Sequence, residues 1–261
     1  MKNNLIKYAG TKIKYVDLIN KHINQTDGTI YVEPFLGSGS VFLNLEKEFD
    51  RYILNDKDRN VIRIFKSFKD ADYELFKACE NTILEKFGDI KKNKEDYYNF
   101  RNTFNKKLYL SDDITEGIYL YFLYNSCINS MARFGPNGFN QSFGNRYRSL
   151  TEEQFNSINK RLQKAEFYNM DFFDLDIPNN SVLFLDPPYF YKQTKNYEII
   201  SEDWFNRFIE YINESKNEII YTDVNHNKID WERVSIRTMQ NISPNRKQEY
   251  TLDEMLYTNK Y

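Results

Sequence analysis

The stretch IYVEPFLGSGSVFLN, residues 30–44, is the part of this sequence that most strongly indicates the fold. Residues 29–33 are rich in β-branched and apolar side chains, which predicts a short strand. Gly37 and Gly39 follow closely, and glycine permits positive φ angles and a close approach of the backbone to a ligand. Open α/β sheets bind nucleotides at the carboxyl ends of their strands, so the pattern predicts a nucleotide-type site. The alternative is a tight strand-to-helix turn with no ligand role.

Asp56 strengthens the prediction of a nucleoside site. It ends a second predicted strand, residues 52–54, about 20 residues after the glycine turn, where an acidic residue accepts hydrogen bonds from ribose hydroxyls. The third glycine of a dinucleotide fingerprint is missing, which favours a nucleoside that lacks phosphates. A helix is expected between the two strands, at residues 41–49.

A second motif, LFLDPPYF at residues 183–190, ends a short apolar run with an acid and two prolines. The exocyclic amine of a nucleobase is a poor nucleophile because its lone pair is delocalised into the ring. Asp186 offers a carboxylate and Pro187 a backbone carbonyl to accept the two N–H groups of such an amine. Pro188 fixes the turn, and Tyr189 offers a ring face to the base. Beside a nucleoside cofactor the motif predicts methyl transfer to an aromatic amine; the alternative is a proline-stiffened turn with an exposed acid.

The rest of the chain alternates between helix and strand signals, with no repeat and no Pro/Gly-rich linker. Residues 57–128 carry apolar side chains at helical spacing and are expected to be mostly helical. Thr151 and Gln154 form a capping-box pattern at the start of a further helix. Ser201 is expected to open another helix, before a strand at residues 218–222. These signals predict an α/β core at both ends of the chain with a helical and irregular insert between them.

The composition limits the kind of protein this is. The chain has 261 residues, of which 41% are hydrophobic, and its apolar runs are too short to span a bilayer. No apolar signal core follows Met1, so we expect a cytoplasmic protein without membrane contact. Cys79 and Cys127 are expected to be reduced thiols rather than a disulfide. His22 and His226 have no Cys or Glu cluster at ligand spacing, so no metal site is expected.

Charge gives a mixed indication about nucleic acid. The formal net charge is -2, which by itself argues mildly against a nucleic-acid partner. Lysine and arginine nevertheless cluster near the start of the chain, at residues 91–107 and at residues 133–148. A local basic face is sufficient for phosphate contacts, and binding through it should be modest and strongly salt-dependent.

Taken together, these motifs resemble those of the Dam-type (DPPY, class alpha) DNA adenine-N6 methyltransferases, which use S-adenosyl-L-methionine (AdoMet). The resemblance covers almost the whole chain in the same motif order: IKYAGTK at 6–12, VEPFLGSGSVFLN at 32–44, YILNDKD at 52–58, NSCINSMARFGPNGFNQSFG at 125–144, and FYNMDFFD at 167–174 before LDPPY. It implies an α/β, Rossmann-like AdoMet-dependent methyltransferase fold with a mixed, mostly parallel sheet and an inserted, mainly helical DNA-recognition domain. The expected catalytic domain comprises residues 1–56 and 160–261, and the expected insert comprises residues 57–159 with a hairpin loop near 129–148.

The resemblance also implies which residues serve the cofactor and the chemistry. By similarity, the residues that contact AdoMet are Tyr8, Lys12, Asp56, Asp171, Phe172 and Asp186, to which the glycine turn adds Phe35, Gly37 and Gly39. Asp171 and Phe172 are expected to flank the adenine of AdoMet. The expected catalytic residues are Asp186, Pro187 and Tyr189. From the residues alone, Tyr8 is interpreted as a core aromatic residue, Lys12 as a solvated charge and Asp171 as an ordinary loop acid.

The segment at residues 125–144 resembles the DNA-recognition region of the family. Its amides, arginines and aromatic residues suit base edges and phosphates. The expected DNA-binding residues are Lys7, Asn129, Met131 and Arg133, which match sequence-reading positions of the family, together with Ile128, Asn140 and Arg146. Ile128 stands where many members carry an aromatic wedge, although an apolar wedge also unstacks bases, and Ser142 stands where a proline is common. The alternative for this segment is a surface β-hairpin with a Pro-Asn-Gly turn.

The leading hypothesis is an AdoMet-dependent enzyme that methylates N6 of adenine in double-stranded DNA by base flipping, at GATC or a related site. One alternative is methylation of another amine, such as cytosine N4, an RNA adenine or a protein glutamine; Asp rather than Ser or Asn at position 186 favours adenine. The other is a non-enzymatic DNA-binding relative that keeps the fold. A cognate restriction endonuclease is a candidate partner, a monomer is favoured, and a bacterial or phage-infected cell is the expected setting.

Overall fold

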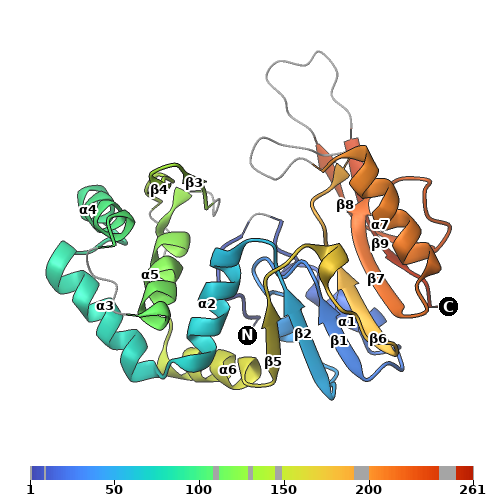
Figure 1. Cartoon of the computed structure of the whole chain (residues 1–261), viewed down its shortest axis with the longest axis horizontal. Helices are drawn as coiled ribbons and strands as arrows, with labels where there is room; N and C mark the ends of the chain where they lie inside the picture. The colour runs from blue at the N-terminus through green and yellow to red at the C-terminus, as the bar shows by residue number, and fades with distance from the viewer. Residues whose placement is uncertain are drawn as a thin grey trace, which may run out of the picture. The chain divides into compact units, whose positions relative to one another are not determined.

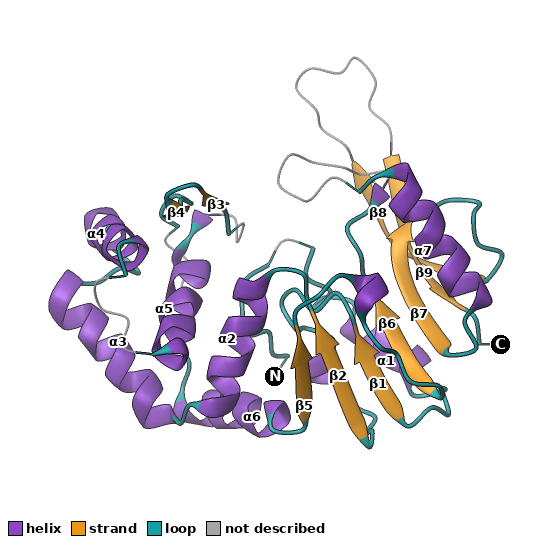
Figure 2. Cartoon of the chain, viewed as in Figure 1, coloured by secondary structure: helices purple, strands orange, loops and turns teal. Residues whose placement is uncertain are grey.

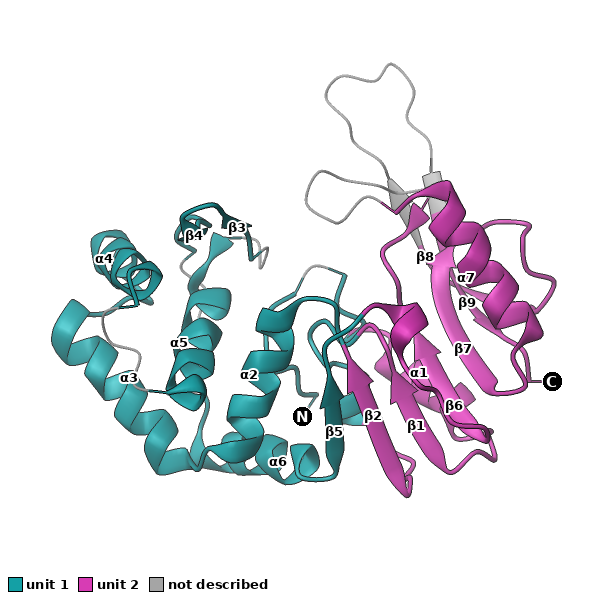
Figure 3. Cartoon of the chain, in the orientation of Figure 1, with its two compact units in different colours: residues 1–13, 36–44, 56–170 teal, residues 14–35, 45–55, 171–261 magenta. Residues whose placement is uncertain are grey.

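The computed structural model describes residues 2–8, 10–107, 112–128, 132–144, 149–190, 200–240 and 251–260. The chain divides into two units, each assembled from three separate stretches of sequence (Figure 3). Unit 1 comprises residues 1–13, 36–44 and 56–170, and unit 2 comprises residues 14–35, 45–55 and 171–261. The two units are defined by how the chain packs, whereas the expected catalytic and DNA-recognition domains are defined by function. The expected domains therefore remain a prediction.

The strands form a mixed sheet, as the resemblance implies (Figures 1 and 2). Within unit 2 its strand order, among the described residues, is β2-β1-β6-β7-β9-β8. The strands of unit 2 are β1 (Ile30–Glu33), β2 (Arg51–Asn55), β6 (Ser181–Leu185), β7 (Glu218–Val224), β8 (Glu232–Gln240) and β9 (Thr251–Thr258). Neighbouring strands from β2 to β7 are parallel, whereas β9 is antiparallel to both β7 and β8. The strands expected at 29–33, 52–54 and 218–222 are confirmed, with small differences at their ends.

The strand order reverses beside β1. The chain continues from β1 to β2 on one side, and β6 pairs with β1 on the other, with Val32 opposite Leu183. Open α/β sheets bind ligands at such a reversal, outside the carboxyl ends of the strands. Every residue of β6 is buried, so the residues that directly follow it emerge at this edge of the sheet.

Helices α1 (Val16–Ile23) and α7 (Glu202–Glu214) of unit 2 pack against β7. Phe208 on the buried face of α7 contacts Tyr221 of β7, with ring centroids 5.4 Å apart. Ser201 opens α7 as predicted, because its Oγ accepts the backbone N–H of Trp204 at 3.1 Å.

Unit 1 is mostly helical, which confirms the prediction for residues 57–128. Its elements are α2 (Arg59–Asp70), α3 (Tyr73–Phe87), α4 (Lys94–Asn105), α5 (Asp113–Ser126), β3 (Phe134–Gly135), β4 (Gly138–Phe139), α6 (Glu152–Leu162) and β5 (Ala165–Tyr168). Phe68 on α2 lies in an aromatic core, with the ring centroids of Tyr121 and Phe155 at 4.7 and 5.3 Å. The capping box predicted for Thr151 and Gln154 is confirmed at the start of α6.

The helix predicted at residues 41–49 is wrong, because this segment forms only the short 3₁₀ turn η1 (Phe42–Asn44). The backbone N–H of Asn44 donates to the carbonyl of Val41 at 3.0 Å, and its side-chain Nδ2 donates to the carbonyl of Ser40 at 2.7 Å. In an α-helix the Ser40 carbonyl accepts the backbone N–H of Asn44. The side chain occupies that carbonyl instead, so the turn does not continue as an α-helix.

Three features bear on composition-based expectations. No helix in the described ranges is both long enough and apolar enough to cross a membrane. Within the same ranges, no three His, Cys, Asp or Glu side chains are grouped so that they could hold a metal ion. Cys79 and Cys127 are buried free thiols, as predicted.

Candidate functional site

Asp186 directly follows β6, at the edge where the strand order reverses. Thr222 on β7 donates from Oγ1 to Asp186 Oδ1 at 2.7 Å. The hydroxyl oxygen of Tyr189 lies 3.2 Å from the same carboxylate oxygen. Pro187 is buried, whereas Asp186 and Tyr189 are partly exposed. The structure therefore brings the three expected catalytic residues to the end of a buried strand, with the acid held by the Thr222 hydroxyl.

The Tyr189 hydroxyl also contacts a second acid, Glu254 on β9. The distance from Oη to Glu254 Oε1 is 2.6 Å, and Arg237 on β8 pairs through Nε with the other oxygen of Glu254. Burial, together with the negative charges of Asp186 and Glu254, raises the pKa of Tyr189 well above its usual value. The Tyr189 hydroxyl therefore keeps its hydrogen at neutral pH, and the role of its ring as a stacking face remains a prediction.

Phe172 belongs to an aromatic cluster in unit 2. The ring of Phe35 stacks on it with centroids 5.5 Å apart, and the ring of Tyr211 meets it edge-on at 5.0 Å. Asp171 opens the 3₁₀ turn η3 (Phe172–Asp174), where its Oδ1 accepts the backbone N–H of Phe173 at 3.2 Å. The structure thus brings Phe35 and Phe172 together and fixes Asp171 beside them, while their contact with an adenine remains a prediction.

The turn after β1, which belongs to unit 1, has the backbone conformation that glycine permits. Gly37 and Gly39 have φ angles of +48° and +67°, as the motif predicts. The backbone N–H of Gly39 donates to the carbonyl of Leu36 at 2.8 Å and closes the turn. A Cβ atom on Gly37 would lie 3.2 Å from the ring of Tyr8, so Tyr8 packs closely against this turn.

Asp56 holds the same turn through its carboxylate. Its Oδ2 accepts the backbone N–H of Gly37 at 2.8 Å, and its Oδ1 accepts that of Asp58 at 2.9 Å. Although part of the residue remains exposed, desolvation of the carboxylate raises the pKa of Asp56 to about 7, against the lowering effect of the two backbone hydrogen bonds. Each carboxylate oxygen has two lone pairs, so Asp56 retains capacity to accept further hydrogen bonds, such as those from a ribose diol.

Lys12 is buried, with 3% of its surface exposed, so its interpretation as a solvated charge is wrong. Its Nζ donates to the carbonyl of Gly10 at 3.0 Å, and its backbone N–H donates to Ser40 Oγ at 3.2 Å. Ser40 follows the glycine turn directly. Unit 1 therefore places Tyr8, Lys12 and Asp56 around one loop.

The β-hairpin considered as an alternative for the recognition segment is present, because β3 and β4 pair antiparallel. Arg133 precedes this hairpin, and its Nε donates to Asn140 Oδ1 at 2.7 Å. The backbone of Asn140 also donates to the carbonyl of Arg133 at 2.9 Å. The structure therefore joins these two expected DNA-binding residues, and the hairpin is compatible with a DNA contact.

The other expected DNA-binding residues are placed as follows. Lys7 donates from Nζ to the carbonyl of Asn125 at 3.1 Å, at the end of α5. Ile128 is 43% exposed, as a wedge into a base stack requires. Asn129, Met131 and Arg146 lie outside the described residues.

Sequence reasoning missed the residues that hold Asp186 and Tyr189, namely Thr222, Arg237 and Glu254. Thr222 lies in a predicted strand, and a polar side chain near the carboxyl end of a parallel strand is a signal that identifies it. Arg237 and Glu254 lie opposite each other only because β8 and β9 pair antiparallel. Local sequence pattern predicts strands but not which residues of two strands face each other.

Curated proteins similar to this chain are DNA methyltransferases. The DNA adenine methylase of Escherichia coli (strain K12) is 33% identical over 196 residues, which cover 72% of this chain and 66% of that methylase. The Type II methyltransferase M.MjaIII of Methanocaldococcus jannaschii is 29% identical over 197 residues, which cover 70% of this chain and 68% of that protein. The DNA N-6-adenine-methyltransferase of Escherichia phage P1 is 27% identical over 190 residues, which cover 71% of this chain and 24% of that protein.

The similar proteins and the family model match different lengths of sequence. The chain spans 66% of the length of the Escherichia coli methylase, just under two thirds. The family model of the D12 class N6 adenine-specific DNA methyltransferases matches residues 8–242, which include the glycine turn, Asp56 and the Asp-Pro-Pro-Tyr segment. The chain therefore belongs to the D12 class N6 adenine-specific DNA methyltransferase family.

Proposed function

We propose that this protein transfers a methyl group from AdoMet to N6 of adenine in double-stranded DNA. The observation that carries the proposal is Asp186, which follows β6 at the reversal of the strand order and is held there by Thr222 at 2.7 Å. Membership of the D12 class family and similarity to proteins named DNA adenine methylase support the choice of adenine N6 over other amines.

The residues after β6 supply hydrogen-bond acceptors for the target amine. The Asp186 carboxylate and the Pro187 carbonyl each accept one N–H of the amine, which draws the nitrogen toward tetrahedral geometry and frees its lone pair. The Thr222 hydroxyl fixes the orientation of the carboxylate before the base arrives, so little reorganisation accompanies the reaction. Tyr189 offers its ring to the flipped base.

Each unit, taken by itself, contains residues that we expect to contact a nucleoside-type methyl donor. In unit 1, Asp56 accepts the ribose hydroxyls, Gly37 and Gly39 permit close approach of the backbone, and Tyr8 and Lys12 complete the loop. In unit 2, the expected contributors are Phe35, Asp171, Phe172 and Asp186. When bound, AdoMet supplies an electrophilic methyl group.

DNA recognition is assigned to the hairpin and its neighbours. Arg133, oriented by Asn140, is proposed to contact a base edge, and exposed Ile128 is proposed to enter the base stack while the adenine flips. Lys7, Asn129, Met131 and Arg146 complete the proposed contact set, and GATC or a related sequence is the proposed target. The name of M.MjaIII supports a cognate restriction endonuclease as partner, and we propose a cytoplasmic monomer.

Expression in a host that lacks DNA methylation tests this function. Sequencing of the host DNA with detection of modified bases should find N6-methyladenine in one short sequence, and that DNA should become resistant to nucleases that methylation blocks. An Asp186→Ala variant expressed at the same level serves as control and should leave the DNA unmodified. Methylation of cytosine or RNA, or unmodified DNA beside a stable and AdoMet-binding protein, would contradict the proposal.

A further inference from the structure

The Tyr189 hydroxyl lies between two carboxylates but carries a single hydrogen. Its oxygen is 2.6 Å from Glu254 Oε1 and 3.2 Å from Asp186 Oδ1. The shorter distance assigns the hydrogen to Glu254. Because the pKa of Tyr189 is raised well above its usual value by burial and by the two acids, the hydroxyl is a hydrogen-bond donor throughout the neutral range.

Glu254 has no exposed surface, yet each of its carboxylate oxygens has a hydrogen-bonding partner. It lies opposite Val224 on β7 and opposite Arg237 on β8, and the Arg237 guanidinium pairs with its second carboxylate oxygen. A buried carboxylate is costly unless it is paired and hydrogen-bonded. Here Arg237 supplies the opposite charge and Tyr189 the hydrogen bond, so both carboxylate oxygens are used.

We infer that Glu254 is a positioning residue that takes the hydrogen of the Tyr189 hydroxyl and so keeps Asp186 an acceptor for the target amine. Asp186 Oδ1 already accepts a hydrogen bond from Thr222 at 2.7 Å. A second donated hydrogen from Tyr189 would draw negative charge toward Oδ1 and so weaken the carboxylate as an acceptor for the amine. The inference rests on the proposed function. It adds Glu254 and Arg237 to the residues that position the groups of the proposed site.

The Glu254→Gln variant tests this arrangement. The amide oxygen of the glutamine suits the Arg237 guanidinium, which leaves its NH₂ group facing Tyr189. That NH₂ donates to the tyrosine oxygen, and the tyrosine hydrogen then turns to Asp186. The single-turnover methyl-transfer rate constant should fall about tenfold, while the KM values for AdoMet and DNA change less than about twofold, because only the acceptor strength of Asp186 is altered.

A double-mutant cycle with Tyr189→Phe separates positioning from simple structural support. Phenylalanine has no hydroxyl hydrogen, so Glu254→Gln should have no further effect on the rate constant in the Tyr189→Phe background.

Glu80→Gln is the matched control, since Glu80 is also a buried acid, paired with Lys77 and Lys91. This variant should lower Tm without changing the rate constant. Arg237→Gln, at a side chain that is 41% exposed, is the second variant if Glu254→Gln folds poorly, and its effect on the rate should likewise require the Tyr189 hydroxyl.

The outcomes distinguish this inference from the proposed function. An active wild type in which the effects of Glu254→Gln and Tyr189→Phe multiply independently overturns the inference alone. An unchanged rate in folded Glu254→Gln protein does the same. A wild type that transfers no methyl group to DNA overturns the proposed function, and this inference with it. Loss of the Glu254→Gln effect in the Tyr189→Phe background is the result expected.

Discussion

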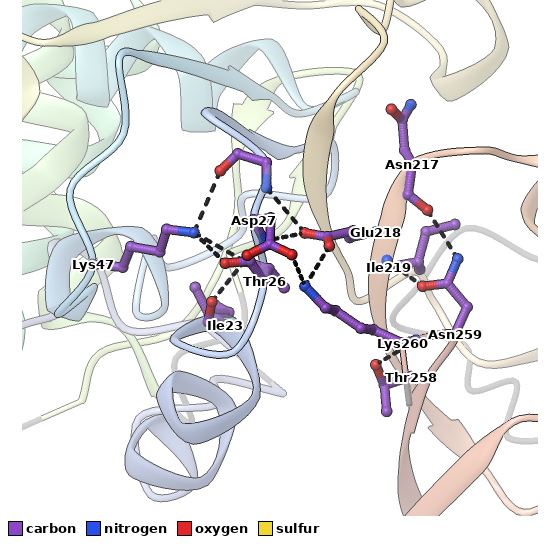
Figure 4. Close-up of polar contacts among 11 residues, drawn as sticks. Ile23, Thr26, Asp27, Lys47, Asn217, Glu218, Ile219, Thr258, Asn259 and Lys260 are labelled. Carbon is purple, nitrogen blue, oxygen red and sulfur yellow. Dashed lines mark hydrogen bonds and ion pairs between the residues drawn. The ribbon is translucent and has the colours of Figure 1, made fainter.

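The two edges of the sheet in unit 2 carry polar networks of opposite character. At the amino ends of β1 and β7, Glu218 accepts the backbone N–H groups of Asp27 and Gly28 at 2.7 and 3.1 Å, and Lys260 bridges Glu218 and Asp27 (Figure 4). The Asp27 side chain is 91% exposed. Although partial burial opposes the change, hydrogen bonds from Lys260 and from the backbone lower the pKa of Glu218. The charged side chains at this edge therefore pair with one another.

At the carboxyl ends of β6 and β7, a buried acid and a partly exposed acid lie beside hydroxyl groups. Glu254 has no exposed surface, and Asp186 accepts from Thr222 and lies near the Tyr189 hydroxyl. Burial raises the pKa of Tyr189, which follows β6. Burial also lowers the pKa of His226, which follows β7, to about 4. These shifts oppose the charged forms, whereas the shift of Glu218 favours its charged form.

The contrast leads us to expect that the two ends of the sheet serve different purposes, stability at one and chemistry at the other. Exposed ion pairs add little stability and no reactive group, because water screens them. Buried acids cost stability unless they are paired, and groups whose titration is shifted by burial concentrate at functional sites. We therefore expect substitutions at the carboxyl edge to change methyl transfer and substitutions at the amino edge to change stability alone.

Asp186→Ala should produce the largest effect. Loss of the charged acceptor should lower the single-turnover rate constant of methyl transfer, measured at saturating AdoMet and DNA, by roughly 10² or more. Asp27→Ala, which removes an acid from the amino edge, is the matched control and should retain the wild-type rate constant. Equal rate constants for the two variants would contradict the expectation that only the carboxyl edge takes part in methyl transfer.

Substitutions of the glycines that flank β1 should also have different effects, one on AdoMet binding and the other on thermal stability. At Gly37, φ is +48° and a Cβ would lie 3.2 Å from the Tyr8 ring, so Gly37→Val should weaken AdoMet binding about tenfold or more, or about 1.4 kcal/mol. At Gly28, before β1, a Cβ would lie 2.9 Å from the carbonyl oxygen of Asn180, so Gly28→Val should lower Tm. Calorimetric titration of the folded variants checks the first expectation, and it fails if Gly37→Val binds AdoMet as tightly as Gly28→Val does.

AdoMet binding should weaken at acidic pH. The pKa of Asp56 is about 7, and a ribose hydroxyl donates to the ionised carboxylate, so affinity should fall about tenfold between pH 8 and pH 6. The stability of the free protein should change in the opposite sense. Because the folded pKa is raised, the folded state binds the proton more tightly, and ionisation of Asp56 lowers stability as pH rises toward and through about 7. A pH-independent dissociation constant in the wild type would contradict this role, and Asp56→Asn should abolish the dependence.

Glu218→Gln should produce the smallest effect. Loss of the charge-assisted bonds to Asp27, Gly28 and Lys260 should lower the free energy of unfolding by about 1 kcal/mol, with methyl transfer unchanged. Because the folded pKa of Glu218 is lowered, its contribution is present above its unfolded pKa and disappears as pH falls through the folded pKa. Thermal unfolding at neutral and acidic pH measures both, and a slower transfer rate would show that the amino edge is not purely structural.

Local sequence patterns predicted the elements well where one residue type decides the structure. The Thr151 and Gln154 capping box, the Ser201 cap and the positive φ of Gly37 all depend on short-range hydrogen bonds or sterics. The helix expected at 41–49 failed for a local reason of another kind, because the Asn44 side chain competes for the Ser40 carbonyl.

The candidate site was predictable only in part. Asp186, Asp56 and Gly37 each end or follow a strand in a recognisable motif, so their positions at the ends of strands could be predicted from sequence. The burial of Lys12 and the pairing of Glu254 with Arg237 and Tyr189 depend on contacts between distant segments. Such contacts are set by register and tertiary packing, which one sequence does not display.

Hydrogen–deuterium exchange with mass spectrometry tests the central claim, that ligands bind at the carboxyl edge and not at the amino edge. The protein is compared alone and with saturating S-adenosyl-L-homocysteine and a duplex containing GATC. Exchange should slow in peptides covering residues 35–39, 171–173 and 186–190, and it should not change in peptides covering residues 26–29 and 216–219. Protection of the amino-edge peptides with no protection at residues 186–190 would contradict the account.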